Sequence, residues 1–273
     1  MPRVAVVGNL SRDVVDRGAP SPGGCPMFAA AVAQQLAEAV QIVTRYAAAD
    51  ADVFRPALDT FDAELTVLPA ETTSGFSLDY VGEDREMDVT GIGETWRPED
   101  ATALARDVEW VHVAPLLRSD FPAETLASFA DGRRVSLDGQ GLVRASSIGR
   151  LRVDATYDPA VLEAVTTLKL SEEEARIVSG GAFDRRAAER LGVPEVLLTL
   201  GSHGAVVFVD DGETFVPAAW PVLGVQTTGA GDTFMVGYAV ARTDGQDPVG
   251  AARAGSRLVA EMLEERKQAQ STR

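Results

Sequence analysis

Cysteine and histidine are scarce in this 273-residue chain, which has one cysteine, Cys25, and two histidines, His112 and His203. A single cysteine excludes an internal disulfide framework and a zinc site built from cysteines, and two histidines exclude a histidine-rich metal site. No apolar run approaches the ~20 residues of a membrane span. Residues 4–7 read as a strand, with no signal-peptide layout before them. We therefore expect a cytoplasmic protein that does not associate with a membrane.

Positive charge is also scarce. The 25 lysines and arginines are outnumbered by 41 acidic residues, and only Lys169 and Lys267 are lysines. The net charge of −16 argues against nucleic acid as a partner, because nucleic-acid binding needs a basic face. An apolar content of 45% suffices for one large core, so we expect a single domain over residues 1–273, as a monomer or a homodimer.

Short β-branched runs alternate with amphipathic stretches along most of the chain. Strands are predicted at 4–7, 41–46, 64–68, 108–113, 134–137, 167–170 and 196–200. Helices are predicted at 26–36, 53–61, 98–106, 122–129, 159–164, 172–179 and 184–191. This alternation is typical of an α/β protein with parallel βαβ units. It predicts a doubly wound, mostly parallel sheet with helices on both faces.

Two stretches interrupt this alternation with hairpin patterns. Residues 74–80 and 85–89 read as two strands around a turn, and we expect them to project from the sheet as a small lid at about 74–89. Residues 205–209 and 213–217 form the second hairpin pattern. The chain is then expected to close with helices at 230–241 and 249–263 and a frayed tail at 266–273.

The most informative stretch is the sequence TTGAGD at 227–232, which leads into an apolar helix pattern. Gly229 and Gly231 allow the backbone to approach a ligand closely. The free N–H groups of a helix start attract anions, phosphate above all. Asp232 in such a pocket suits a general base that takes a proton from a hydroxyl attacking the phosphate. The alternative is a helix capped by an aspartate after a glycine-rich turn.

With this turn at the start of a C-terminal helix, the chain resembles the PfkB (ribokinase-like) carbohydrate kinases, in order over essentially its whole length. The resemblance implies a ribokinase-like fold and phosphoryl transfer from ATP to an alcohol. It implies that Asp232 is the general base. It also implies that the backbone amides of Gly229, Ala230 and Gly231 form the anion hole.

The resemblance extends to the acceptor side. GNLSRD at 8–13 matches the family's glycine and aspartate after the first strand, and the glycine pair at 23–24 matches its Gly-Gly signature. DGQGLVR at 138–144 resembles the inositol-kinase-like members. These matches imply that substrate is bound by Asn9, Asp13, Gly23, Gly24, Gln140 and Arg144. A turn or cap role for Asp13 and an ordinary surface position for Arg144 stay open.

Two further segments resemble the donor side of the family. KLSEEE at 169–174 is similar to its KxNxxE motif, which implies that Glu174 helps to hold Mg²⁺; the segment also reads as a helix cap followed by first-turn acids. TLGSHG at 199–204 matches the nucleotide loop, and the last two helices are expected to border adenine. ATP contacts are implied for Thr199, Gly201, Gly204, Thr228, Gly255 and Ser256.

Three residues depart from the family pattern. Phe28 and Ser171 stand where asparagine is common, and Gln226 replaces an aspartate that helps to hold a monovalent cation in many relatives. The segment between 13 and 23 is also short, so little lid is expected beyond residues 74–89. The expected acceptor is a small sugar or a cyclitol such as myo-inositol, with ATP and Mg²⁺ as cofactors. A nucleoside kinase and a catalytically silent ligand-binding relative are the alternatives.

Overall fold

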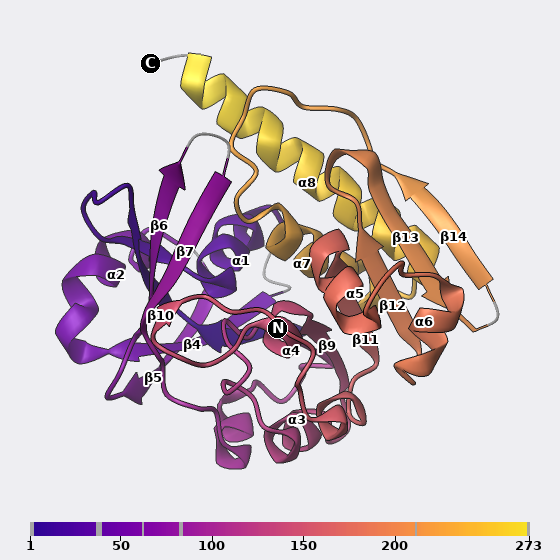
Figure 1. Cartoon of the computed structure of the whole chain (residues 1–273), viewed down its shortest axis with the longest axis horizontal. Coiled ribbons are helices and arrows are strands. Elements are labelled where there is room, and N and C mark those ends of the chain that lie inside the picture. Colours follow the sequence, from indigo (N-terminus) through magenta and orange to yellow (C-terminus); the bar gives the residue numbers. More distant parts are fainter. Residues whose placement is uncertain (1–2, 37–39, 62, 82–83, 211, 272–273) are drawn as a thin grey trace.

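The computed structural model describes residues 3–36, 40–61, 63–81, 84–210 and 212–271. Its main element is a nine-stranded sheet with the order β14-β13-β12-β11-β9-β8-β1-β4-β5 (Figure 1). The strands from β12 to β5 run parallel, whereas β13 and β14 are antiparallel at one edge. The predicted doubly wound, mostly parallel sheet is confirmed. In chain order its strands are β1 (Val4–Asn9), β4 (Val40–Ala47), β5 (Glu64–Ala70), β8 (Trp110–Val113), β9 (Arg134–Asp138), β11 (Thr167–Ser171), β12 (Glu195–Thr199), β13 (Gly204–Val209) and β14 (Gly212–Pro217).

Helices cover both faces of this sheet, and strand β1 shows why. Val4 and Val6 pack into one apolar core and Ala5 and Val7 into the other, and all four are fully buried. Successive side chains of a strand point to opposite faces, so a strand that is apolar throughout needs a cover on each. The first core is covered by α1 (Cys25–Ala33), α7 (Ala230–Thr243) and α8 (Pro248–Ser271), and the second by α3 (Ala123–Phe129), α5 (Glu172–Ser179) and α6 (Arg185–Arg190).

The lid is larger than the predicted hairpin. The hairpin itself is present as β6 (Ser74–Val81) and β7 (Asp84–Gly91), but it belongs to a five-stranded sheet with the order β10-β7-β6-β2-β3. The added strands are β2 (Ser11–Val15), β3 (Ser21–Gly23) and β10 (Gly149–Arg150). Arg150 pairs with Glu86 at 2.8 Å and with Asp88 at 3.1 Å, which fastens β10 to β7.

Local structure differs from the prediction at three other places. The helices expected at 98–106 and 159–164 are short 3₁₀ helices, η3 (Pro98–Ala103) and η4 (Pro159–Leu162). The tail expected to be frayed at 266–273 is helical through Ser271, as the end of α8. The other α-helices of the described residues are α2 (Ala51–Leu58) and α4 (Gln140–Val143).

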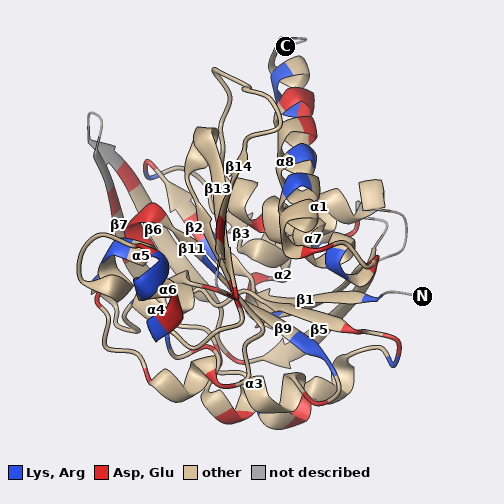
Figure 2. Ribbon diagram, turned by 90° about the vertical axis from the view of Figure 1, so that its right-hand side faces the viewer, with Lys and Arg blue, Asp and Glu red and all other residues tan. Residues whose placement is uncertain are grey.

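Helix α8 extends beyond the body of the fold and carries acidic and basic residues along its length (Figure 2). Gln35 donates to both carboxylate oxygens of Glu265, at 3.0 and 2.9 Å, which ties the last turns of α8 to the segment after α1. Within the described ranges, no helix is both long and apolar enough to span a bilayer.

Candidate active site

Two cavities lie beyond the C-terminal ends of the parallel strands, where ligands of open α/β sheets bind. One, of about 370 Å³, lies between the main sheet and the lid and is called the acceptor cavity here; its lining includes Asp13, Gln140, Arg144 and Asp232. The other, of about 390 Å³, lies against α7, α8 and the end of β12 and is called the donor cavity. Thr227 and Gly231 line both cavities, so the two meet at the turn that begins α7.

The backbone of this turn is shaped by Gly229. Gly229 has φ of 82° and precedes α7, a left-handed conformation that glycine adopts without strain. The first bond of the helix runs from the Thr233 amide to the Gly229 carbonyl at 2.9 Å. The amides of Gly231 and Asp232 therefore have no acceptor within the helix. The Ala230 amide, expected in the anion hole, donates to the Thr227 carbonyl at 3.0 Å.

Asp232 lies in the first turn of α7, at the wall of the acceptor cavity. Desolvation and the nearby charge of Asp138 raise the pKa of Asp232 to about 6, against the opposing effects of Lys169, the Cys25 thiol and Arg144. Burial raises the pKa of the Cys25 thiol, so the neutral S–H donates to Asp232. A carboxylate with a pKa near neutrality is suited to accept a proton from an alcohol.

A buried ion pair lies beside the turn. Lys169 lies in the middle of β11, and its Nζ is 3.0 Å from Oδ2 of Asp138, the last residue of β9, and 4.0 Å from Glu174 Oε2. Desolvation disfavours the ammonium, but the charges of Asp138 and Glu174 outweigh it and raise the pKa of Lys169. The same nitrogen lies 3.4 Å from the point that a Cβ on Gly231 would occupy. The site thus holds a permanently charged cation against the turn that begins α7.

Glu174 lies at the start of α5 and serves its helix as well as the cavity. Its carboxylate accepts from the Ser171 amide at 2.8 Å, and the Ser171 hydroxyl accepts from the Glu174 amide at 3.3 Å. This capping box matches one of the two interpretations of the motif. Because Glu174 also lines the acceptor cavity, the cap leaves it beside the ligand space.

The acceptor cavity has a polar floor and an apolar roof. Asp13 and Gly24 line it, and Gly23 makes room for the carboxylate, because a Cβ on Gly23 would lie 2.0 Å from Asp13 Oδ2. The roof comes from the lid strands, with Phe76 and Leu78 on β6 and Met87 on β7. Such a cavity can hold the hydroxyls of a ring on one side and its C–H face on the other.

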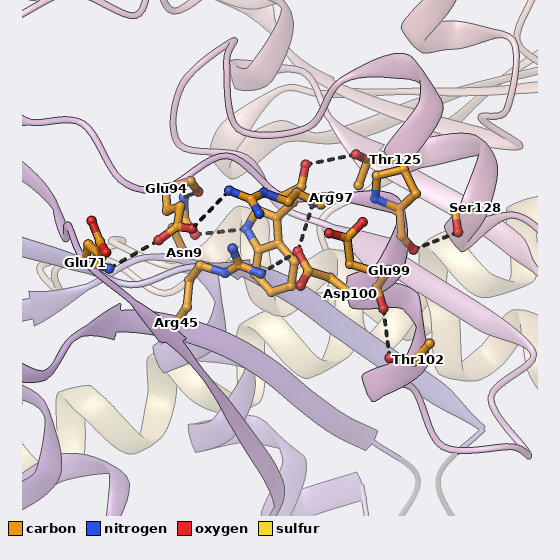
Figure 3. A network of polar contacts seen from close by, with 12 residues as sticks. Asn9, Arg45, Glu71, Glu94, Arg97, Glu99, Asp100, Thr102, Thr125 and Ser128 are labelled. Atoms are coloured by element: carbon orange, nitrogen blue, oxygen red, sulfur yellow. Dashed lines mark hydrogen bonds and ion pairs between the residues drawn. The ribbon is translucent and has the colours of Figure 1, made fainter.

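Asn9 is not among the residues that line the acceptor cavity. It is 1% exposed, accepts from Trp96 Nε1 at 2.9 Å and donates to the Glu94 carbonyl at 3.3 Å (Figure 3). The Arg45 guanidinium lies 4.0 Å from the centre of the Trp96 ring and pairs with Asp100 at 2.5 Å. The side chain of Asn9 is thus engaged where β1 passes into the lid, behind the site.

The expected donor residues divide between the two cavities and the core. Thr199, Gly201, Gly204 and Ser256 line the donor cavity. Thr228 lines the acceptor cavity. Gly255 lies between α7 and α8, where a Cβ would meet the Phe234 carbonyl at 2.5 Å, so its role there is close helix packing.

Three residues at the site received no functional role from the sequence. The Cys25 thiol donates a hydrogen bond to the carboxylate of Asp232, and Lys169 pairs with the buried carboxylate of Asp138. The ring of Phe28 packs against Gly229. One signal was available for Lys169, which is one of two lysines in the chain. Cys25 is the single cysteine of the chain and Phe28 departs from the family pattern, but neither feature distinguishes a site residue from an ordinary core residue.

A family model described as pfkB family carbohydrate kinase matches residues 15–272. The chain belongs to this family. The match confirms the resemblance indicated by the TTGAGD turn and the segments that precede it along the chain.

Inositol 3-kinases are among the curated proteins similar to this PfkB chain. The enzyme of Oryza sativa subsp. japonica is 34% identical over 115 residues, and that of Zea mays is 32% identical over 128 residues. These alignments cover 39% and 45% of this chain but 27% and 32% of the two relatives, so the chain matches about a third or less of their length. The fructokinase of Klebsiella pneumoniae is 31% identical over 152 residues, 52% of this chain and 48% of that protein.

Solved structures resemble the PfkB chain over nearly its whole length. A pyrophosphate-dependent kinase of the ribokinase family, complexed with a pyrophosphate analog and myo-inositol, has a TM-score of 0.81 at 21% identity and covers 96% of this chain and 95% of its own. Arabidopsis thaliana ribokinase, complexed with ribose and ATP, has a TM-score of 0.68 at 20% identity and covers 96% and 93%. At such identities the likeness concerns the fold, and it confirms the predicted ribokinase-like class.

Proposed function

We propose that this protein transfers the γ-phosphoryl group of ATP to a hydroxyl of a small sugar or cyclitol. The observation that carries the proposal is that the start of α7 borders both cavities, with Thr227 and Gly231 lining each. A phosphoryl group bound by the amides of this helix start faces an acceptor in one cavity and its leaving group in the other. Family membership supports the same reaction.

The residues of the cleft have distinct roles in this reaction. Asp232 takes the proton of the acceptor hydroxyl while the hydroxyl oxygen bonds to the γ-phosphorus. The bond from that phosphorus to the bridging oxygen breaks, and ADP leaves with the electron pair. The free amides of Gly231 and Asp232 and the ammonium of Lys169 stabilise the charge on the transferring group. Asp13 orients the acceptor by accepting from its hydroxyls.

The residues of the cleft fit Mg²⁺ bound mainly by phosphates. Within the described part of the chain, no group of three or more Asp, Glu, His or Cys residues is placed to hold a metal. Mg²⁺ keeps several waters and needs few protein carboxylates when phosphates are present. Asp138 pairs with Lys169, and Asp13 and Asp232 have other roles in this proposal, so Glu174 would help to hold the ion. When bound, the ion supplies charge neutralisation at the phosphate oxygens.

The donor cavity supports ATP over pyrophosphate. Its wall includes the apolar side chains of Trp220, Val222, Val259 and Leu263. A donor made of phosphates alone has no apolar group to pack against this surface. An adenosine moiety buries apolar surface in such a cavity and gains affinity from it. Because similar solved structures include pyrophosphate-dependent kinases, the experiment tests the donor separately.

The acceptor cavity supports a polyhydroxylated ring. Asp13, Gln140 and Arg144 offer hydrogen bonds to hydroxyls, and the lid offers Phe76 and Leu78 to one face of the ring. The inositol 3-kinase relatives support a cyclitol such as myo-inositol. The alternatives are a nucleoside acceptor and a ligand-binding protein that transfers no phosphate.

The experiment is a matrix of donors and acceptors with Mg²⁺. ATP and pyrophosphate are each tested with myo-inositol, ribose, fructose and inosine, and phosphorylated products are detected by ³¹P NMR. Asp232→Asn, purified in the same way, is the matched control, because product that persists in this variant comes from a contaminating enzyme. Product from ATP with a sugar or cyclitol, absent in the variant, is expected. Faster turnover with pyrophosphate overturns the donor, faster turnover of inosine overturns the acceptor, and binding without product overturns the kinase.

A further inference from the structure

The segment that leads into the anion-binding turn is long and irregular. From Ala218 to Gly229 the chain has neither helix nor strand structure, and it connects β14 to α7. Trp220 and Val222 of this segment line the donor cavity, Thr228 lines the acceptor cavity, and Thr227 lines both. The position of one loop therefore sets both binding spaces and the amides between them.

Arg266, in the exposed last part of α8, reaches this loop. Its Nη1 nitrogen donates to the carbonyl oxygen of Gln226 at 3.1 Å and to that of Thr228 at 2.7 Å. The two N–H groups of one terminal guanidinium nitrogen thus hold two carbonyls that are two residues apart. Leu263, one turn earlier on α8, lines the donor cavity, so the helix that walls this cavity also carries the anchor.

The geometry points to Arg266 as a positioning residue for the anion-binding turn, an inference that rests on the proposed function. In a trans peptide the C=O and N–H groups point in opposite directions. Holding the Thr228 carbonyl toward α8 therefore turns the Gly229 amide away from α8, on the side where Gly229 lines the acceptor cavity. Gly229 itself imposes little on the loop, because glycine populates many conformations. Arg266 supplies the restraint that the glycine lacks.

The guanidinium also contributes charge. A cation with two hydrogen bonds to the loop polarises the carbonyls and favours an anion on the opposite, amide side of the same peptides. Because arginine stays protonated at all working pH values, this charge does not depend on pH. Gln226 contributes a backbone oxygen to the contact, and its own side chain brings no charge to the loop.

The test compares Arg266→Ala with Arg257→Ala. Arg257 is an exposed arginine on the same helix, and it lines neither cavity. Arg266→Ala is expected to lower kcat by about 10–100-fold, with a smaller change in KM and a melting temperature within a few degrees of wild type. Millimolar guanidinium chloride is expected to restore part of kcat in Arg266→Ala. Arg266→Lys should be intermediate, since an ammonium lacks the planar fork. Arg257→Ala should match wild type.

Hydrogen exchange of residues 219–229 separates this inference from the proposed function, because it needs no turnover. Faster exchange in Arg266→Ala but not in Arg257→Ala supports the anchor even if the wild-type protein transfers no phosphate. Unchanged exchange in Arg266→Ala, or a kcat within about twofold of wild type, overturns it. An equal loss of kcat in both variants overturns it as well, because the effect would then follow net charge.

Discussion

The ring of Phe28 lies directly against Gly229. A Cβ on Gly229 would stand 2.4 Å from Phe28 Cδ1, closer than any side chain tolerates. A residue of α1 thus packs under the turn that precedes α7, and the turn keeps its shape only while position 229 has no side chain. Phe28 replaces the asparagine that is usual in the family, and in this chain its ring packs against Gly229.

This contact predicts a specific loss in Gly229→Ala. Gly224→Ala is the matched control, because Gly224 also has a positive φ, 74°, but its Cβ would meet nothing within 4 Å. Both variants should lose roughly 1 kcal/mol of unfolding free energy from backbone strain. Gly229→Ala should in addition lose kcat by roughly 10²-fold, since the amides of the turn are displaced. Steady-state kinetics and urea unfolding measure the two effects, and partial recovery in Phe28→Ala/Gly229→Ala would assign the loss to this contact.

Asp232→Asn is expected to abolish turnover while donor binding persists. Loss of a general base costs roughly 10²–10⁴-fold in kcat. In the wild type, kcat/KM should rise with pH and level off above about 6, because Asp232 must be ionised to act. Rate measurements across pH and calorimetric titration with ATP test this, and a near-normal kcat in the variant would exclude the mechanism.

Although Asp232→Asn is expected to lose activity, it is expected to raise the free energy of unfolding at high pH. The pKa of Asp232 is raised to about 6 in the folded state, so its contribution to stability is full below about 3.9 and is lost as pH rises through about 6. Asp232→Asn lacks this loss and should gain up to about 2 kcal/mol of unfolding free energy at pH 8 relative to wild type. At pH 4 the two proteins should be equal. Urea unfolding at both pH values measures the difference, and an equal offset at both would contradict the assignment to ionisation.

Lys169→Met should destabilise the fold by about 3–5 kcal/mol, because it leaves Asp138 charged and buried without its partner. Asp138→Leu combined with Lys169→Met should recover most of this stability but none of the activity. The pKa of Asp138 is held low, so the pair's contribution is present above the unfolded pKa and disappears as pH falls through the folded value. Arg150→Met, at an exposed pair on the lid, should cost under about 1 kcal/mol. Equal losses for the two single variants would argue against a buried, uncompensated charge.

The lid hairpin is expected to close when both ligands bind. Phe76 and Leu78 roof the acceptor cavity, and closure over an acceptor would exclude water from the transfer. Hydrogen exchange should slow in 74–81 and 84–91 with acceptor and a non-hydrolysable ATP analogue present, and should stay constant in the β13–β14 hairpin. Unchanged exchange in the lid with both ligands bound would rule out this role. The hairpin tip at 82–83 lies outside the described residues.

Activity is expected to depend little on K⁺. Gln226 stands where many relatives carry an acid, and an amide lacks the charge that offsets cation dehydration. The carbonyls of Gln226 and Thr228 already accept from Arg266. The measurement is kcat/KM in potassium against tetramethylammonium at matched ionic strength. A stimulation of about tenfold, or ~1.4 kcal/mol, would show that a cation site survives in the loop.

Local pattern and spacing were sufficient to predict the strands of the main sheet in chain order, but not the lid strands β2, β3 and β10. Period and apolar content along 4–7 and 41–46 predict buried parallel strands, and the TTGAGD turn predicts a helix start that binds anions. These features depend on residues close together in the chain, so they can be read directly. The hairpin in the lid is of the same kind, since its strands and turn are adjacent.

Long-range partners were decided by the tertiary structure alone. Asn9 and Asp13 belong to the same short motif, yet the amide oxygen of Asn9 accepts from Trp96, 87 positions away. The tail is helical at Arg266, whose side chain reaches back to Thr228. Lys169 and Asp138 meet because β11 and β9 are neighbours in the sheet, an order that no single strand encodes. Side-chain chemistry and periodicity are properties of a segment, whereas the charge, burial and orientation of a catalytic group depend on which segments fold against it.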